Sequence, residues 1–286
     1  MNTLVLGSSG QLASHLKQLL PDADFWGRND CDLNDLQAAR EAVMRMRPAA
    51  MINAAAFTAV DRAEEQRSDA WRLNADAVAV LSETAEKLGI PFVHISTDYV
   101  FDGTHKSPYE VTDAPCPVST YGKTKLAGEL AATTLCSNHF VFRVSWLFSE
   151  FGANFVKTML RLATERDSLS IVDDQRGVPT YAGDLARAVA ATIARRDELR
   201  LPPGIYHVTG GRPVSWCQFA GEIFAKAKRL ALIGRIPELI PIPTSEYPTA
   251  AQRPLNSVLK VSPEIASVLK VSFDWELSLE PMLKRL

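Results

Sequence analysis

Short apolar runs alternate with segments of helical periodicity through the first half of the chain. The apolar runs lie at residues 3–6, 50–54, 91–96 and 140–144. Apolar side chains recur with a helical period at residues 11–20, 35–47, 68–88 and 119–132. Strands buried on both faces are nearly all apolar, so this alternation predicts an α/β fold built on a parallel sheet with helices on both faces.

The pattern changes from about Ser145, where it becomes less regular and richer in proline. We therefore expect a main domain over residues 1–146 and a smaller C-terminal domain over residues 147–286. Some C-terminal segments, such as residues 204–208, are expected to return to the main domain. In parallel sheets of this kind, ligands bind at the carboxyl ends of the strands, so informative residues are expected just after each strand.

Charge and composition exclude several classes of partner. The chain has 286 residues, with 31 Lys and Arg against 33 Asp and Glu, and a formal net charge of −2. Without a cluster of like charges, we expect no nucleic-acid partner and no membrane-surface partner. No apolar stretch reaches the roughly 18 residues of a membrane span. Residues 1–7 lack the basic region of a signal peptide, which favours a cytoplasmic protein.

A glycine-containing turn follows the first expected strand. Gly7, Gly10 and Ala13 form the pattern G-x-x-G-x-x-A at the start of the first expected helix. Glycines let backbone N–H groups approach a pyrophosphate, and the helix N-terminus adds a favourable dipole. A plain glycine turn would give a similar pattern. Its position between strand and helix favours dinucleotide binding, and hence a Rossmann-type doubly wound sheet.

The residues some twenty positions further on bear on the choice of cofactor. An acidic side chain here would hold a ribose 2′-hydroxyl, whereas an arginine would meet a 2′-phosphate. The segment contains Arg28, which favours NADPH and leaves NADH open; the alternative is a solvated loop charge. Asp32 and Leu33 are candidates for the adenine edge, and Asp32 also suits the start of a helix.

The sharpest chemical signal is the pair Tyr121 and Lys125. Their i, i+4 spacing places both on one face of the expected helix. A lysine ammonium beside a phenol lowers the pKa of the phenol, which suits the tyrosine for proton transfer near neutral pH. Such a pair alone is mostly surface helix. Thr97 lies at the end of an apolar strand, where its hydroxyl would be free to hold a substrate oxygen.

These motifs together resemble the extended short-chain dehydrogenase/reductase family. Further segments are similar to one branch of it, the dTDP-4-dehydrorhamnose reductases. They are residues 53–61 (NAAAFTAVD), 96–103 (STDYVFDG), 121–129 (YGKTKLAGE), 142–146 (FRVSW) and 253–257 (RPLNS). The resemblance spans nearly the whole chain. It implies reduction of the C4 keto group of dTDP-4-dehydro-L-rhamnose to give dTDP-L-rhamnose for cell-surface polysaccharide synthesis.

The resemblance also implies roles for individual residues. Tyr121 would be the general acid, Lys125 would tune it and hold the nicotinamide ribose, and Thr97 would position the keto oxygen. The implied cofactor-binding residues are Gly7, Gly10, Gln11 and Leu12 at the pyrophosphate, Asp32 and Leu33 at the adenine, and Ala55, Ala56 and Thr58 after the third strand. The implied substrate-binding residues are Asp98 and Trp146 at the sugar and Arg253 near the diphosphate. The smaller domain would bind the nucleotide sugar.

One departure from the family pattern concerns metal. Some members have a magnesium site of glutamates at a dimer interface. The matching place in the first helix is His15, the region after residues 177–180 has Gly183, and Glu276 would be the remaining ligand. We therefore expect no magnesium site, a surface position for His15, and either a monomer or a homodimer.

Two alternatives to a reductase remain at this stage. A nucleotide-sugar dehydratase of the superfamily typically has T-D-E where this chain has Tyr99 after Thr97 and Asp98, and an epimerase would retain its NAD. A non-catalytic NADP-binding regulatory subunit belongs to another class. The chain retains Thr97, Tyr121 and Lys125, so nothing in it demands a loss of activity.

Overall fold

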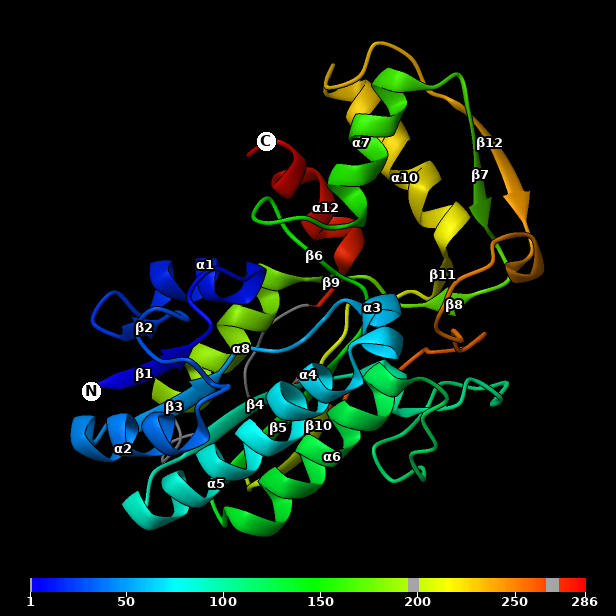
Figure 1. Ribbon diagram of the computed structural model, residues 1–286. Coiled ribbons are helices and arrows are strands. Elements are labelled where there is room, and N and C mark those ends of the chain that lie inside the picture. Colours follow the sequence, from blue (N-terminus) through cyan, green and yellow to red (C-terminus); the bar gives the residue numbers. More distant parts are fainter. Residues whose placement is uncertain (1, 195–200, 266–272) are drawn as a thin grey trace.

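The computed structural model describes residues 2–194, 201–265 and 273–286. Its centre is a sheet with strand order β10-β5-β4-β3-β1-β2 (Figure 1). The strands are β1 (Thr3–Leu6), β2 (Asp24–Trp26), β3 (Ala50–Asn53), β4 (Phe92–Thr97), β5 (His139–Val144) and β10 (Gly204–His207). Neighbouring strands all run parallel. The expected doubly wound α/β fold is confirmed.

Alternate residues of each strand enter two separate cores. On β1, Val5 packs with α1 (Gln11–Leu19) and α8 (Ala182–Ala194) on one face of the sheet. Leu4 and Leu6 pack on the other face with α2 (Leu36–Met46), α5 (Ala77–Leu88) and α6 (Thr120–Leu135). Both faces are therefore covered, as the nearly continuous apolar strands require.

Residues 68–88, expected as one helix, contain a change of helix type. The chain continues from α3 (Val60–Glu65) through α4 (Arg67–Trp71) into a π-helical turn, η1 (Arg72–Asp76), and then α5. α5 ends at Gly89, which has φ +65° and whose N–H donates to carbonyl groups of the last turn. π-helical turns inside helices are frequent near functional sites.

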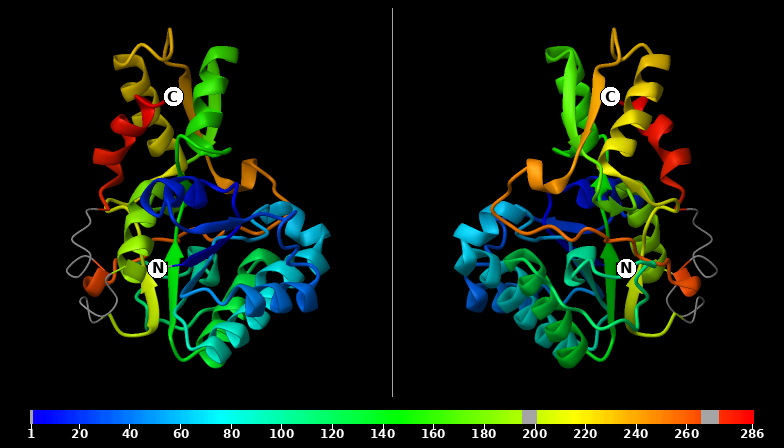
Figure 2. Two further views of the ribbon diagram at one scale, coloured as in Figure 1. Left: turned by 90° about the vertical axis from the view of Figure 1, so that its left-hand side faces the viewer. Right: turned by 90° about the vertical axis from the view of Figure 1, so that its right-hand side faces the viewer.

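A smaller group of elements, called here the C-terminal lobe, stands at one end of the sheet. It contains α7 (Phe155–Glu165), β7 (Ser168–Val172), α10 (Trp216–Arg229), β12 (Glu238–Ile242) and α12 (Trp275–Leu283). Short strands and one turn connect the lobe to the sheet: β6 (Leu147–Phe148), β8 (Arg176–Gly177), β9 (Thr180–Tyr181), β11 (Val214–Ser215) and η3 (Thr244–Glu246). Figure 2 shows the lobe standing above the sheet in both views. It has its own apolar core.

The chain passes between the two regions more than once. After the first lobe helix, α8 returns to pack on α1, and β10 joins the sheet beside β5. The segment 204–208 thus lies largely in the main sheet. Among the described residues, no helix is both long and apolar enough to cross a membrane.

Candidate active site

Thr97 and Tyr121 come together at the carboxyl end of β4. The Thr97 side chain lies close enough to the Tyr121 hydroxyl to influence its pKa, and the Thr97 hydroxyl donates to Asp98 Oδ1 over 2.9 Å. Tyr99, in the short 3₁₀ turn η2 (Asp98–Val100), packs edge-on against the Tyr121 ring with centroids 5.8 Å apart. Gly122 permits this approach, because a Cβ there would overlap the Tyr99 carbonyl oxygen.

Burial, rather than Lys125, sets the acidity of Tyr121. Burial raises the pKa of Tyr121 to about 12, and the Thr97 side chain offsets only part of that rise. Lys125, expected to lower this pKa, is not among the groups that set it in the structure. The physical reason is that the lysine amine is directed elsewhere. The phenol stays protonated at neutral pH, which is the form of a proton donor.

The Lys125 amine is directed at the backbone and at a histidine of the sheet. Lys125 is 1% exposed, and its Nζ lies 2.6 Å from the Ile95 carbonyl oxygen and 3.3 Å from His94 Nε2. Burial lowers the pKa of Lys125 to about 8, against the opposing charge of Glu129. The Lys125 amine is thus held by two groups of β4.

Asp98 is a buried carboxyl beside the same centre. It is 2% exposed, and its Oδ2 has no hydrogen-bond partner among the described residues. Burial raises the pKa of Asp98 to about 7. An unpaired buried oxygen is costly to the folded protein, so it is a candidate acceptor or donor for a ligand hydroxyl.

The glycine turn after β1 lies against the loop after β3. Gly7 has φ +98°, and a Cβ there would lie 2.7 Å from the Ala55 amide nitrogen, so only glycine fits. Gly10 caps α1 without any side-chain hydrogen bond, and a Cβ there would meet nothing within 4 Å. No side chain caps the first N–H groups of α1. Gln11 and Leu12 follow; the Leu12 side chain is buried and only its backbone faces the turn.

The loop after β2 holds the residues expected near the adenosine. Arg28 is exposed, with no ion pair in the described part of the chain. Asp32 Oδ1 accepts from the Asn34 backbone N–H over 3.0 Å, so its carboxylate shapes the approach to α2. Leu33 is 7% exposed and packs into the core, which leaves little of its side chain for an adenine.

One buried asparagine holds the loop after β3 in place through hydrogen bonds. Ala55 and Ala56 are partly buried, and Thr58 is exposed. Asn74, from the π-helical turn, is fully buried; its Oδ1 accepts from the Phe57 N–H over 2.8 Å. Its Nδ2 donates to the Phe57 carbonyl and to Thr124 of α6. The turn η1 thus ties the expected cofactor loop to the helix that bears Tyr121.

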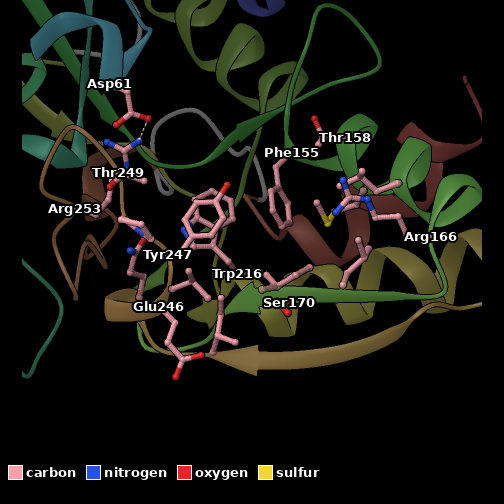
Figure 3. A pocket seen from close by; sticks show the side chains of 18 of the residues that line it. Asp61, Phe155, Thr158, Arg166, Ser170, Trp216, Glu246, Tyr247, Thr249 and Arg253 are labelled. Atoms are coloured by element: carbon pink, nitrogen blue, oxygen red, sulfur yellow. Dashed lines mark hydrogen bonds and ion pairs between the residues drawn. The ribbon is translucent and has the colours of Figure 1, made fainter. Parts of the chain in front are cut away.

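A cavity of about 1040 Å³ opens between the sheet and the C-terminal lobe (Figure 3). It begins at Tyr99, next to Tyr121, and extends to Arg166 in the lobe. Trp216 and Tyr247 project into its middle in Figure 3, and Arg253 stands at the opposite end from Arg166.

Arg253 and Trp146, both expected at the substrate, lie at or near this cavity. Arg253 Nη2 pairs with Asp61 Oδ2 over 2.7 Å, while its Nη1 is buried with no partner in the described chain. Trp146 follows β5 with φ 47°, and its ring stacks on Trp216 with centroids 3.4 Å apart. Trp146 therefore supports a wall residue of the cavity.

His15 is not a surface residue, contrary to expectation. It is 4% exposed, and its Nε2 lies 3.0 Å from Ser149 Oγ and 3.4 Å from Glu150 Oε2. Glu150 also accepts from Arg285 Nη1 over 2.9 Å, near the end of the chain. Within residues 2–194, 201–265 and 273–286, no group of three or more His, Cys, Asp or Glu side chains forms a metal cluster. Glu276 pairs with Arg212 instead.

Several site residues were not singled out by the sequence analysis. Asn53 and His94 are polar residues inside otherwise apolar strands, and this interruption was a usable signal. Asn74 carries no comparable signal, because a polar residue in a helix is ordinary. Arg166 and Tyr247 lie on lobe segments without a motif.

The chain matches one known protein family along its whole length. The family model described as "RmlD substrate binding domain" matches residues 1–286. The chain is 40% identical to the dTDP-4-dehydrorhamnose reductase of Salmonella typhimurium, over 99% of this chain and 97% of that one. A crystal structure of the Bacillus anthracis dTDP-4-dehydrorhamnose reductase, in complex with NADP, superposes with a TM-score of 0.91 at 32% identity and covers 100% of each chain. The Clostridium acetobutylicum protein gives 0.90 at 35% identity, with 100% and 99% covered.

The doubly wound sheet, the glycine turn and the Thr97–Tyr121 pair define a nicotinamide-dependent oxidoreductase. The full-length similarities are more specific than this class. The chain belongs to the dTDP-4-dehydrorhamnose reductase family, whose activity it shares as an NAD(P)H-dependent oxidoreductase. UDP-glucose 4-epimerases with bound NAD or UDP-glucose share the fold at 18–19% identity.

Proposed function

We propose that the protein uses NADPH to reduce the C4 keto group of dTDP-4-dehydro-L-rhamnose, as a step in polysaccharide synthesis. The observation that carries this proposal is a protonated Tyr121 beside Thr97, in ring contact with Tyr99, which lines a cavity large enough for a nucleotide sugar. Tyr121 gives its proton to the C4 oxygen, and Thr97 holds that oxygen by a hydrogen bond.

The turn after β1 fits a dinucleotide pyrophosphate. Gly7 lets the backbone approach closely, and the uncapped N–H groups at the start of α1 offer donors to a phosphate. The bound nicotinamide supplies the hydride. Ala55 and Ala56 line its path, and Arg28 meets the 2′-phosphate of NADPH. The Bacillus anthracis relative was solved with NADP, which supports this choice.

The C-terminal lobe binds the nucleotide part of the substrate in this proposal. The buried, unpartnered Nη1 of Arg253 is a ready donor for a diphosphate oxygen. Asp98 meets the sugar hydroxyls through its unpaired Oδ2. Residues 1–146, with α8 and β10, bind the dinucleotide, and the remaining segments after residue 147 bind the sugar nucleotide.

The test is the oxidation of NADPH by the purified protein with dTDP-4-dehydro-L-rhamnose, followed by absorbance and by identification of the product sugar. We expect oxidation coupled one to one to dTDP-L-rhamnose. Stoichiometric NAD in the purified protein, without net oxidation, would favour an epimerase. Binding of NADPH with no turnover of either cofactor would favour the non-catalytic subunit.

A further inference from the structure

A chain of buried hydrogen bonds connects the cofactor loop to Lys125. The Ala55 N–H donates to Asn53 Oδ1 over 3.2 Å, and Asn53 Nδ2 lies 3.2 Å from His94 Nδ1. On the far side of the imidazole, His94 Nε2 lies 3.3 Å from Lys125 Nζ. Asn53 is 1% exposed and His94 is fully buried, so water does not substitute for these contacts.

The direction of these hydrogen bonds, from donor to acceptor, follows from the first donor, the Ala55 N–H. Asn53 Oδ1 accepts from Ala55, so the Asn53 amide turns its NH₂ group toward His94. His94 Nδ1 therefore accepts, and in a neutral imidazole the proton lies on Nε2. Burial also lowers the pKa of His94 well below its usual value, which keeps the ring neutral.

This polarity disfavours a charged lysine. The Nε2–H of His94 needs an acceptor at Lys125 Nζ, and an amine offers one whereas an ammonium does not. An ammonium would require the other imidazole tautomer, a turned Asn53 amide, and the loss of the bond from Ala55. The charge on Lys125 is thus coupled to the loop that follows β3.

The other polar and charged groups around Lys125 also bear on whether its amine is charged. On its own helix, Glu129 favours the ammonium, but Arg143 of β5 holds Glu129 through contacts of 2.7 to 3.1 Å. Tyr121 on the same helix stays neutral. From η1, the nearest polar side chain is the uncharged Asn74, bonded to Thr124. His94 is the titratable group of β4 that touches the amine.

We propose that His94, oriented by Asn53, is a positioning residue that holds the Lys125 amine against β4 and sets the upper pH limit at which Lys125 carries its charge. This inference rests on the proposed function and on the role that the family resemblance implies for Lys125, which is to hold the nicotinamide ribose as a charged donor. If the ammonium is the form that holds the cofactor, wild-type kcat/KM is expected to fall as pH rises through the Lys125 pKa.

The informative variant is His94→Gln. Glutamine reaches the same point but is free to present an amide oxygen, which accepts from an ammonium. We expect the alkaline limb of kcat/KM to be displaced upward by about one pH unit, whatever the level of activity at pH 7. Asn53→Asp should displace the alkaline limb in the same direction. An aspartate accepts from His94 Nδ1–H and so reverses the direction of the hydrogen bonds between Asn53 and Lys125. A purely structural role would lower activity at every pH and leave the limb in place, which would overturn the proposal.

The matched control is His207→Gln. His207 is also a fully buried sheet histidine beside a cation, with Nε2 3.4 Å from Arg143 Nη1, but it does not touch Lys125. We expect the alkaline limb to stay in place in this variant, and an equal displacement would overturn the proposal.

Two further measurements separate the possible failures. If Lys125→Met keeps wild-type activity, the proposed role of Lys125 fails first; if it loses activity while His94→Gln keeps the wild-type limb, only this inference fails. A measurement on the wild-type protein tests the proposal even if the variants do not fold. The ¹⁵N spectrum of the imidazole should show the proton of His94 on Nε2 above the Lys125 pKa and on Nδ1 below it, where Lys125 is an ammonium. A proton position that does not change with the charge on Lys125 would overturn the proposal.

Discussion

The end of β4 and the cavity of the C-terminal lobe differ in how their polar groups are used. At the sheet, Lys125 and His94 are buried, and each finds partners inside the protein. In the lobe, Arg166 and Tyr247 are exposed on the cavity wall, and Arg253 keeps one buried nitrogen unpaired. A satisfied network fixes geometry and protonation, whereas unpaired donors await a ligand. Changes at the sheet should therefore alter turnover, and changes in the lobe should alter affinity.

The largest effect should come from Tyr121→Phe. It removes the proton donor and leaves the ring against Tyr99, so kcat should fall by about 10²-fold or more with little change in NADPH affinity. Steady-state kinetics and an NADPH titration measure the two effects. Near-wild-type turnover would remove Tyr121 from the mechanism.

Arg253→Met should give the next largest effect, and this effect should appear in KM rather than in kcat. Loss of a charged donor to a diphosphate should raise KM for the sugar nucleotide about 10- to 100-fold, with kcat changed little. Arg235→Met, at an exposed lobe arginine paired with Asp167, is the matched control and should leave KM unchanged. A fall in kcat at constant KM would contradict the division between the two regions.

Asp98→Asn tests the buried carboxyl through stability. The folded protein keeps this proton up to about pH 7, while the unfolded chain releases it near pH 3.8, so unfolding becomes easier as pH rises between these values. Asp98→Asn should therefore raise the free energy of unfolding at pH 8, on the order of 2 kcal/mol. The gain should vanish at pH 3.5, where both side chains are neutral. Denaturant titrations at the two pH values measure it, and an equal gain at both would exclude titration as its cause.

The smallest effect should come from Arg28→Ala. Because Arg28 is exposed, its contact with a 2′-phosphate is partly screened, and KM for NADPH should rise only about fivefold. KM for NADH should not change. Equal increases for both cofactors would remove the 2′-phosphate role.

The sequence predicted the sheet because strand burial and helix periodicity are local properties. The fold, and the positions of Thr97 and Tyr121 after β4 and at the start of α6, followed from pattern and spacing. The direction of the Lys125 amine did not, because it depends on His94, a partner from another element. The burial of His15 also escaped prediction, since it arises from residues 149 and 150 and the C-terminal Arg285 packing near α1. The cavity depends on long-range contacts between segments that carry no motif.

The position of β10 has a consequence for the order in which the protein is made. β5 ends at Val144, but its outer neighbour begins only at Gly204. A nascent chain that has not reached residue 204 presents β5 as an exposed edge, with a row of backbone groups available to other chains. The last pairing of the main sheet thus waits until α7, β7 and α8 have left the ribosome. Synthesis of the sheet and of much of the lobe is interleaved, and a chain cut before residue 204 is expected to aggregate rather than fold as a free dinucleotide-binding unit.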